Sequence, residues 1–125
     1  MEEDLVRAVQ HYGRADGAQA TARLLALKSR PDAILCFNDE MAIGALHAIW
    51  QAGLSVPDEI AVAGFDDTDE SRFSVPSLTS VSWNNPEMAR AAVQHLHDRI
   101  DQRAEIPPRE MEVPFELRIR RSTSA

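Results

Sequence analysis

The stretch that decides the fold is residues 33–65, AILCFNDEMAIGALHAIWQAGLSVPDEIAVAGF. Its two continuous apolar runs, 33–37 and 60–65, are typical of strands covered on both faces of a sheet. Between them, Asn38 is placed as a helix N-cap and Gly53 as the stop, and the two acidic residues of the first turn favour the positive end of the helix dipole. A strand, a helix and a strand of this combined length predict a right-handed crossover in a parallel α/β sheet.

The flanking segments extend this alternation of helices and strands. Residues 16–29 have apolar side chains at helical spacing behind an acidic residue that can cap a helix, and residues 78–83 alternate as a strand does. An amphipathic helix is predicted over 86–103, with proline at its first position. A rigid Pro-Pro connector at 107–108 and a terminal strand within 110–122 follow. Four strand candidates are few for a doubly wound sheet.

Composition and charge narrow the function classes. The 125 residues, 44% of them apolar, fit one soluble domain with one hydrophobic core. Twenty acidic residues against 13 basic ones, with Lys28 as the single lysine, argue against binding of nucleic acid or of an anionic membrane through these residues. The single Cys36 cannot form an internal disulfide and favours a reducing, cytoplasmic location. No apolar stretch approaches the ~18 residues of a membrane span, and the acidic start is unlike a secretory signal.

Polar residues follow both strands of the central unit, at the edge where parallel sheets bind ligands. Asn38 comes directly after the first apolar run, and Asp66 and Asp67 come directly after the second. Loops and helix N-termini converge beyond the carboxyl ends of parallel strands, so an amide and a carboxylate there can bind several hydroxyls of one small polyol. Tyr12 and Trp83 could add aromatic faces that cover a sugar or a flat base.

Each of these residues also has a structural interpretation. Asn38 can serve as a plain N-cap, a role that does not exclude a ligand. Asp66 or Asp67 can cap a short turn over residues 68–73. Trp83 can equally be a core residue or a subunit contact.

Enzymatic and metal-binding interpretations fit less well. The run from Asp67 to Ser71 resembles the nucleophile loop of haloacid-dehalogenase-type phosphatases, but no lysine follows Lys28 to neutralise a phosphoryl group. A calcium loop counted from Asp67 lacks the glycine and the final glutamate that it needs. Since His95 and His97 are two apart on a predicted helix, they point to nearly opposite sides. We therefore expect no catalytic residues, no metal and no cofactor.

Residues 12–123, and most densely residues 31–81, resemble the core of the lactose/galactose repressor family of transcriptional regulators. The motifs P-x-A-I-x-C-x-N-D-E-M-A-x-G-A-L, A-G-L-x-V-P-D-E-I-A-V-x-G-F-D-D and P-x-L-T-S-V occur in the family's order and spacing, and residues 107–123 are similar to its closing segment. The resemblance implies a Rossmann-like parallel sheet flanked by helices, of the periplasmic-binding-protein-like type I class. Residues 1–125 would then be the C-terminal subdomain plus a returning segment, without the DNA-binding headpiece.

The resemblance also implies roles for individual residues. Asn38 and Asp66 match the polar residues that bind effector hydroxyls, and Tyr12 falls where members often place a stacking aromatic. Trp83 stands where many members have glutamine, which implies a more aromatic cleft wall and argues against assuming a lactose-type effector. The implied partners are a small-molecule effector, of carbohydrate type, and operator DNA contacted only through the absent headpiece.

A homodimer is a further implication of the resemblance. The residues that it places at the interface lie on the central helix and in a later loop: Ile43, His47, Trp50, Phe73 and Val75. Packing of these side chains against the chain's own sheet is the alternative. A stand-alone sugar-binding protein of a transport system shares the fold, but the free Cys36 and the repressor-like motifs favour a regulator.

Overall fold

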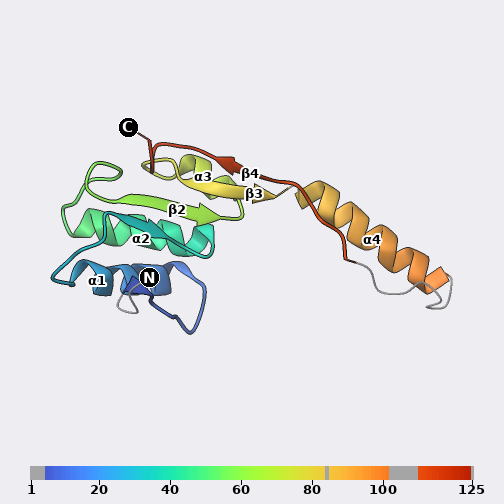
Figure 1. The fold of residues 1–125 in the computed structure, drawn as a ribbon, viewed down its shortest axis with the longest axis horizontal. Coiled ribbons are helices and arrows are strands. Elements are labelled where there is room, and N and C mark those ends of the chain that lie inside the picture. The colour runs from blue at the N-terminus through green and yellow to red at the C-terminus, as the bar shows by residue number, and fades with distance from the viewer. Residues whose placement is uncertain (1–4, 84, 102–109, 125) are drawn as a thin grey trace.

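A computed structural model describes residues 5–83, 85–101 and 110–124, and these form a four-stranded mixed sheet with helices (Figure 1). The elements in chain order are α1 (Arg14–Leu25), β1 (Ala33–Leu35), α2 (Asp39–Gln51), β2 (Ala61–Phe65), α3 (Asp69–Phe73), β3 (Thr79–Trp83), α4 (Asn85–Asp101) and β4 (Phe115–Arg118). The strand order is β1-β2-β3-β4, with β1, β2 and β3 parallel and β4 antiparallel to β3. The predicted α/β class and parallel crossover are confirmed, and β4 adds an antiparallel edge.

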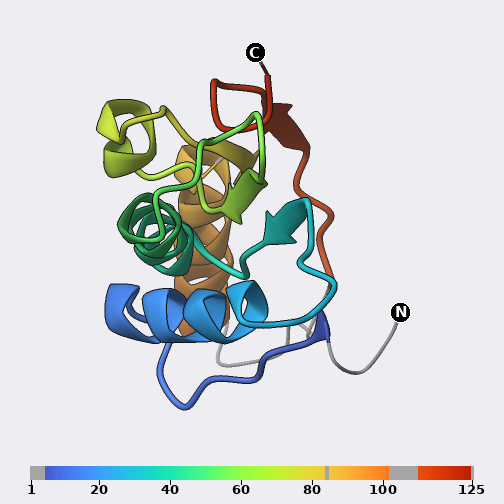
Figure 2. The ribbon, with the colours of Figure 1, turned by 90° about the vertical axis from the view of Figure 1, so that its left-hand side faces the viewer.

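The core lies between the sheet and α2, and α1 packs on α2 (Figure 2). Ile49 of α2 is fully buried against Val62 of β2 and the rest of the core cluster. The two helices approach so closely that a Cβ at Gly44 would lie 2.0 Å from the Arg14 carbonyl oxygen. Glycine is therefore required at this crossing because no side chain fits there.

The opposite face of the sheet is open where the structure describes it. In β1, Ile34 is buried toward α2, whereas Leu35 is 76% exposed and the following Phe37 is 83% exposed. Phe115 and Leu117 of β4 are exposed as well. The prediction of a strand over 33–37 covered on both faces is therefore wrong, because the described helices α1 and α2 cover one face only.

Helix α4 projects away from the sheet and the other helices (Figure 1). It runs over Asn85–Asp101, close to the predicted 86–103, and begins one residue before the proline. The large side chains of its apolar face are exposed: Met88, Val93, Leu96 and Ile100. The described chain thus contains the amphipathic helix without a partner for it.

Two other helix predictions have different outcomes. The boundaries of α2 are confirmed, since the Asn38 side chain caps it and Gly53 follows with a φ of +73°. The helix predicted over 16–29 instead begins at Arg14 and ends at Leu25. Its N-cap is Gly13, which makes no side-chain hydrogen bond, so the prediction that an acidic residue caps this helix is wrong. Asp16 lies within the first turn, where its negative charge interacts favourably with the helix dipole.

The C-terminal segment contains the last strand of the sheet. The predicted terminal strand is β4, whereas the Pro-Pro connector at 107–108 lies outside the described residues. Among the helices of the described ranges, none is long and apolar enough to cross a membrane.

Candidate ligand site at the carboxyl ends of the strands

Asn38 and Asp66 follow neighbouring parallel strands at equivalent positions. Leu35 of β1 pairs with Ala63 of β2, and each polar residue comes three positions after its strand's member of that pair. Both residues are half-buried. The register therefore places an amide and a carboxylate at the same edge of the sheet, as the sequence predicts.

Asn38 holds the segment that carries Tyr12. Its Oδ1 accepts a hydrogen bond from the Met41 N–H at 2.8 Å, and its Nδ2 donates to the Tyr12 carbonyl oxygen at 2.9 Å. The N-cap interpretation is thus confirmed. These bonds use one of the two Nδ2 hydrogens and one of the two Oδ1 lone pairs, so with respect to the described residues the amide keeps one donor and one acceptor. The Tyr12 side chain is exposed beside it.

Asp66 is brought together with Trp83 at the ends of β2 and β3. The Trp83 ring packs edge-on against Phe65, with 4.7 Å between ring centroids. Burial of the Asp66 carboxylate raises its pKa, and the negative charge of Asp39 adds to this effect, while a hydrogen bond from Trp83 opposes it. Among the residues that the structure describes, Asp66 forms no ion pair with arginine or lysine. The Asp66 carboxylate is thus a half-buried hydrogen-bond acceptor that has no cationic partner in the described part of the chain.

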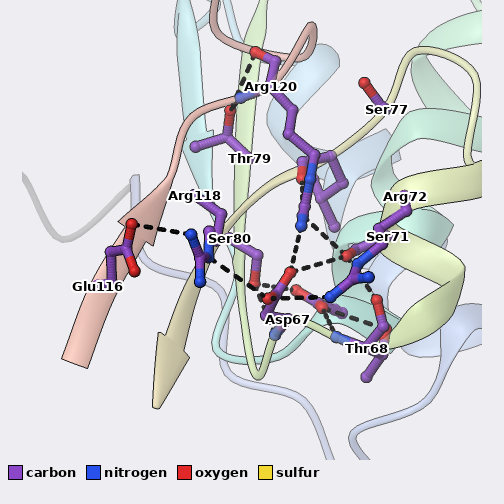
Figure 3. Close-up of polar contacts among 12 residues, drawn as sticks. Asp67, Thr68, Ser71, Arg72, Ser77, Thr79, Ser80, Glu116, Arg118 and Arg120 are labelled. Atoms are coloured by element: carbon purple, nitrogen blue, oxygen red, sulfur yellow. Dashed lines mark hydrogen bonds and ion pairs between the residues drawn. The ribbon is translucent and has the colours of Figure 1, made fainter. Parts of the chain in front are cut away.

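Asp67, the next residue, has the opposite surroundings (Figure 3). Its side chain is only 5% exposed and its carboxylate accepts a hydrogen bond from Arg120 of the C-terminal segment. Burial alone would raise the pKa of this carboxyl, but hydrogen bonds from Arg120 and Ser82 and the charges of Arg120 and Arg72 outweigh it, so the pKa is lowered. This carboxylate is fully engaged within the protein.

The prediction that Asp66 or Asp67 caps the turn over 68–73 is wrong. That segment contains the short helix α3, and its N-cap is Thr68, which makes no side-chain capping bond. The Asp67 carboxylate instead accepts a charge-assisted hydrogen bond from the Arg120 guanidinium.

Sequence reasoning missed Asp39 as a buried residue of this site. The sequence predicts an acidic residue in the first turn of α2, as the structure shows, but it does not predict that this side chain is fully buried. Its Oδ2 accepts hydrogen bonds from the Thr68 N–H at 2.7 Å and the Thr68 hydroxyl at 3.1 Å, and its Oδ1 accepts one from the Ser80 hydroxyl at 2.6 Å. The one sequence feature that fits this role is Gly64, because a Cβ there would lie 2.4 Å from Asp39 Oδ1.

The residues predicted for a dimer interface lie away from this edge. His47 and Trp50 project from α2, with 5.8 Å between their ring centroids, and Phe73 and Val75 follow in and after α3. These four are exposed, and Ile43 is half-buried. Packing of the four against the chain's own sheet is therefore wrong, while their role in a dimer stays a prediction.

The chemistry of the edge suits a polar, uncharged ligand. A carboxylate and an amide can bind hydroxyl groups, and two aromatic rings can cover the C–H face of a ring-shaped molecule. In the described ranges, no group of three or more His, Cys, Asp or Glu side chains could hold a metal ion. Sheet, crossover and polar strand ends together are those of an α/β domain with a ligand site at the carboxyl ends of its strands.

Comparison with known proteins places the chain in that class. The family model described as "Periplasmic binding protein-like domain" matches residues 2–123, and the chain belongs to this family. Over 107 residues it is 39% identical to the HTH-type transcriptional repressor PurR of Mannheimia succiniciproducens, an alignment that covers 86% of this chain and 32% of that protein. Over 70 residues it is 51% identical to the repressor ExuR of Bacillus subtilis, covering 56% and 21%. The chain thus spans about a third or less of these relatives.

Solved structures narrow the relationship to LacI-type regulators. A LacI-family transcriptional regulator from Sanguibacter keddieii superimposes with a TM-score of 0.94 at 39% identity, covering all of this chain and 48% of that one. A LacI-family regulator from Lactobacillus casei, solved with bound glucose, gives a TM-score of 0.76 at 30% identity, covering 90% and 40%. The resemblance to the lactose/galactose repressor family is confirmed.

Proposed function

We propose that residues 1–125 form the C-terminal part of the effector-binding core of a LacI-type transcriptional regulator. The site binds a small polyhydroxylated effector, of carbohydrate type, at the edge formed by Asn38 and Asp66. The observation that carries this proposal is the half-buried Asp66 carboxylate, which has no cationic partner among the described residues while its neighbour Asp67 has one. A half-buried carboxylate without a cationic partner is stabilised when a ligand supplies hydrogen-bond donors to it.

Each site residue has a distinct task in this proposal. Asp66 accepts hydrogen bonds from effector hydroxyls, and Asn38 uses its remaining donor and acceptor on a neighbouring hydroxyl. Trp83 and Tyr12 cover the apolar face of the ring, which contributes burial while the polar groups fix its orientation. None of these tasks breaks a covalent bond, so the proposed site is a binding site and not an enzyme active site.

Effector binding reaches DNA through the rest of the regulator. Because β3, α4 and β4 are consecutive in the chain, an effector held at Trp83 biases the position of the segment that leaves and re-enters this subdomain. That bias changes the arrangement of a homodimer, joined through the exposed face of α2 and the loop at Phe73 and Val75, and thereby its operator affinity. The headpiece makes the DNA contacts, in the cytoplasm.

Several observations support a sugar-responsive regulator over a transport protein. The two relatives compared above are named as repressors, and the similar Lactobacillus casei regulator was solved with bound glucose and with bound sucrose. The free Cys36 is buried, as expected for a protein of a reducing compartment. A transport protein would bind a sugar without any effect on DNA.

Calorimetry on the full-length protein tests the proposal. Glucose, sucrose, pentoses and nucleosides are titrated into wild type, into Asp66→Ala and into the control Asp69→Ala, which removes an exposed carboxylate three residues away. We expect Asp66→Ala to weaken binding at least about 100-fold, because more than one charge-assisted hydrogen bond is lost, and to abolish the effector's influence on operator binding. The control should bind as wild type does. Unchanged binding by Asp66→Ala would refute the assignment.

A further inference from the structure

The turn that presents Asp66 has an unusual backbone conformation. Asp66 has a φ of +115° and Asp67 a φ of +52°, and neither is glycine. Residues with side chains rarely adopt this region, so the surroundings must hold the chain there. The direction of the Asp66 carboxylate therefore depends on what fixes residues 66–68.

Three consecutive backbone N–H groups of this turn are bonded to three different acceptors. The Asp66 N–H donates to the Val81 carbonyl oxygen at 3.0 Å, the Asp67 N–H to Ser80 Oγ at 3.0 Å, and the Thr68 N–H to Asp39 Oδ2 at 2.7 Å. The first bond belongs to the sheet. The other two depend on side chains, and both of those side chains are fully buried.

Asp39 controls both side-chain bonds. A serine hydroxyl has one hydrogen, and Ser80 donates it to Asp39 Oδ1 at 2.6 Å, which leaves its lone pairs to accept from the Asp67 N–H. Asp39 thus holds Thr68 directly and Asp67 through Ser80. Figure 3 shows Asp67, Thr68 and Ser80 gathered at this turn. The carboxylate that orients the turn comes from α2, 27 residues before Asp66 in the sequence.

We propose that Asp39 is a positioning residue of the ligand site: it fixes residues 66–68 so that the Asp66 carboxylate faces the effector. Asp39 itself is fully buried and does not touch a ligand at the edge. The contact depends on Gly64, whose missing side chain leaves room for the Asp39 carboxylate. This inference rests on the proposed function of Asp66.

Asp39→Asn is the matched substitution because it keeps the shape but replaces one acceptor oxygen with a donor nitrogen. Glu40→Gln is the control, since Glu40 lies in the same helical turn and instead pairs with Arg14, with 2.8 Å between Arg14 Nε and Glu40 Oε2. In calorimetry of the full-length protein with glucose and sucrose as probes, we expect Asp39→Asn to weaken binding about tenfold or more and Glu40→Gln to leave it unchanged.

A double-mutant cycle separates positioning from general damage to the fold. If Asp39 acts through Asp66, adding Asp39→Asn to Asp66→Asn causes no further loss of affinity. Additive losses would overturn the proposal, as would wild-type affinity in Asp39→Asn alone. Wild-type affinity in Asp66→Asn would instead overturn the proposed function.

Hydrogen exchange on the full-length protein tests the same inference without any ligand. We expect Asp39→Asn and Ser80→Ala to accelerate exchange of the peptide containing residues 66–68 about tenfold, with the core of α2 still protected. Ser80→Ala decides the matter if Asp39→Asn fails to fold. Unchanged exchange at 66–68, or uniform acceleration throughout the protein, would overturn the positioning role even if neither sugar binds.

Discussion

Asp66 and Asp67, two neighbouring aspartates in the turn after β2, lie in opposite electrostatic environments. Asp67 faces the C-terminal segment, is nearly buried and has its pKa lowered by arginines, which overcome the effect of its burial. Asp66 lies at the end of β2, has no cation among the described residues, and has its pKa raised by burial and by Asp39. Two neighbouring carboxylates at a strand end can thus have separate roles: one fastens the loop, and the other stays available for a ligand.

The division arises from the way in which β4 returns to the sheet. Because β4 is antiparallel to β3, with Arg118 paired to Ser80, the chain beyond it brings Arg120 to the turn. The Arg120 guanidinium also donates to the Leu78 carbonyl oxygen at 2.8 Å and to Ser71 Oγ at 2.9 Å. Arg120 therefore ties β3, α3 and the turn together, and within the described ranges it pairs with Asp67 and not with Asp66.

Removal of Arg120 should have the largest effect on stability. Arg120→Ala leaves the nearly buried Asp67 carboxylate without its main partner, and we expect a loss of about 3–5 kcal/mol in the free energy of unfolding. Arg118→Ala is the control, because Arg118 is 49% exposed and lies 4.0 Å from Asp67, and it should cost under about 0.5 kcal/mol. Urea unfolding of the 125-residue chain measures both values. Similar losses in the two variants would contradict the proposed division of roles.

Substitution of Asp67 should lower the free energy of unfolding more than substitution of Asp66, and both effects should be smaller than that of Arg120→Ala. We expect Asp67→Asn to cost about 1–3 kcal/mol, because the amide weakens a buried charge-assisted bond to Arg120. Asp66→Asn should change the free energy of unfolding by less than about 0.5 kcal/mol at pH 7, since it removes a carboxylate that is partly desolvated and repelled by Asp39. Urea titration of the two variants side by side provides the measurement. A larger loss from Asp66→Asn would mean that Asp66 is the structural residue.

This asymmetry also marks the limit of what the sequence predicts. The crossover over 33–65 follows from local features, namely apolar runs, the Asn38 cap and Gly53, and the structure has all of them. Nothing local distinguishes Asp66 from Asp67, because the deciding partner, Arg120, lies more than fifty residues later. The same reason explains why Asp39 was missed, since its partners Thr68 and Ser80 meet it only in the folded chain.

The open sheet face and α4 show the same limit for packing. The continuous apolar run over 33–37 and the helical periodicity over 86–103 predict apolar faces that include Leu35 and Leu96, but both side chains are exposed in the described chain. A hydrophobic pattern identifies the face that needs a partner and does not identify the partner.

The two carboxylates should also differ in how they make stability depend on pH, an effect that we expect to be smaller than those of the substitutions above. Because the folded-state pKa of Asp67 is lowered, its stabilisation is complete above the unfolded value of about 3.9 and is lost as the pH falls through the folded pKa. The pKa of Asp66 is raised, so its contribution is complete below about 3.9 and is lost as the pH rises through its folded pKa. The two residues therefore act in adjacent pH windows and with opposite signs.

Urea unfolding at closely spaced pH values should resolve the two windows. Asp67→Asn is expected to flatten the rise of stability with pH below about pH 4, and Asp66→Asn to remove a fall of stability with pH just above it. Asp69→Asn, an exposed carboxylate in the same loop, serves as the control and should leave both windows unchanged. If Asp66→Asn and Asp67→Asn altered the same window in the same direction, the two carboxylates would share one environment, and Asp66 would no longer be distinguished as the acceptor that is left for a ligand.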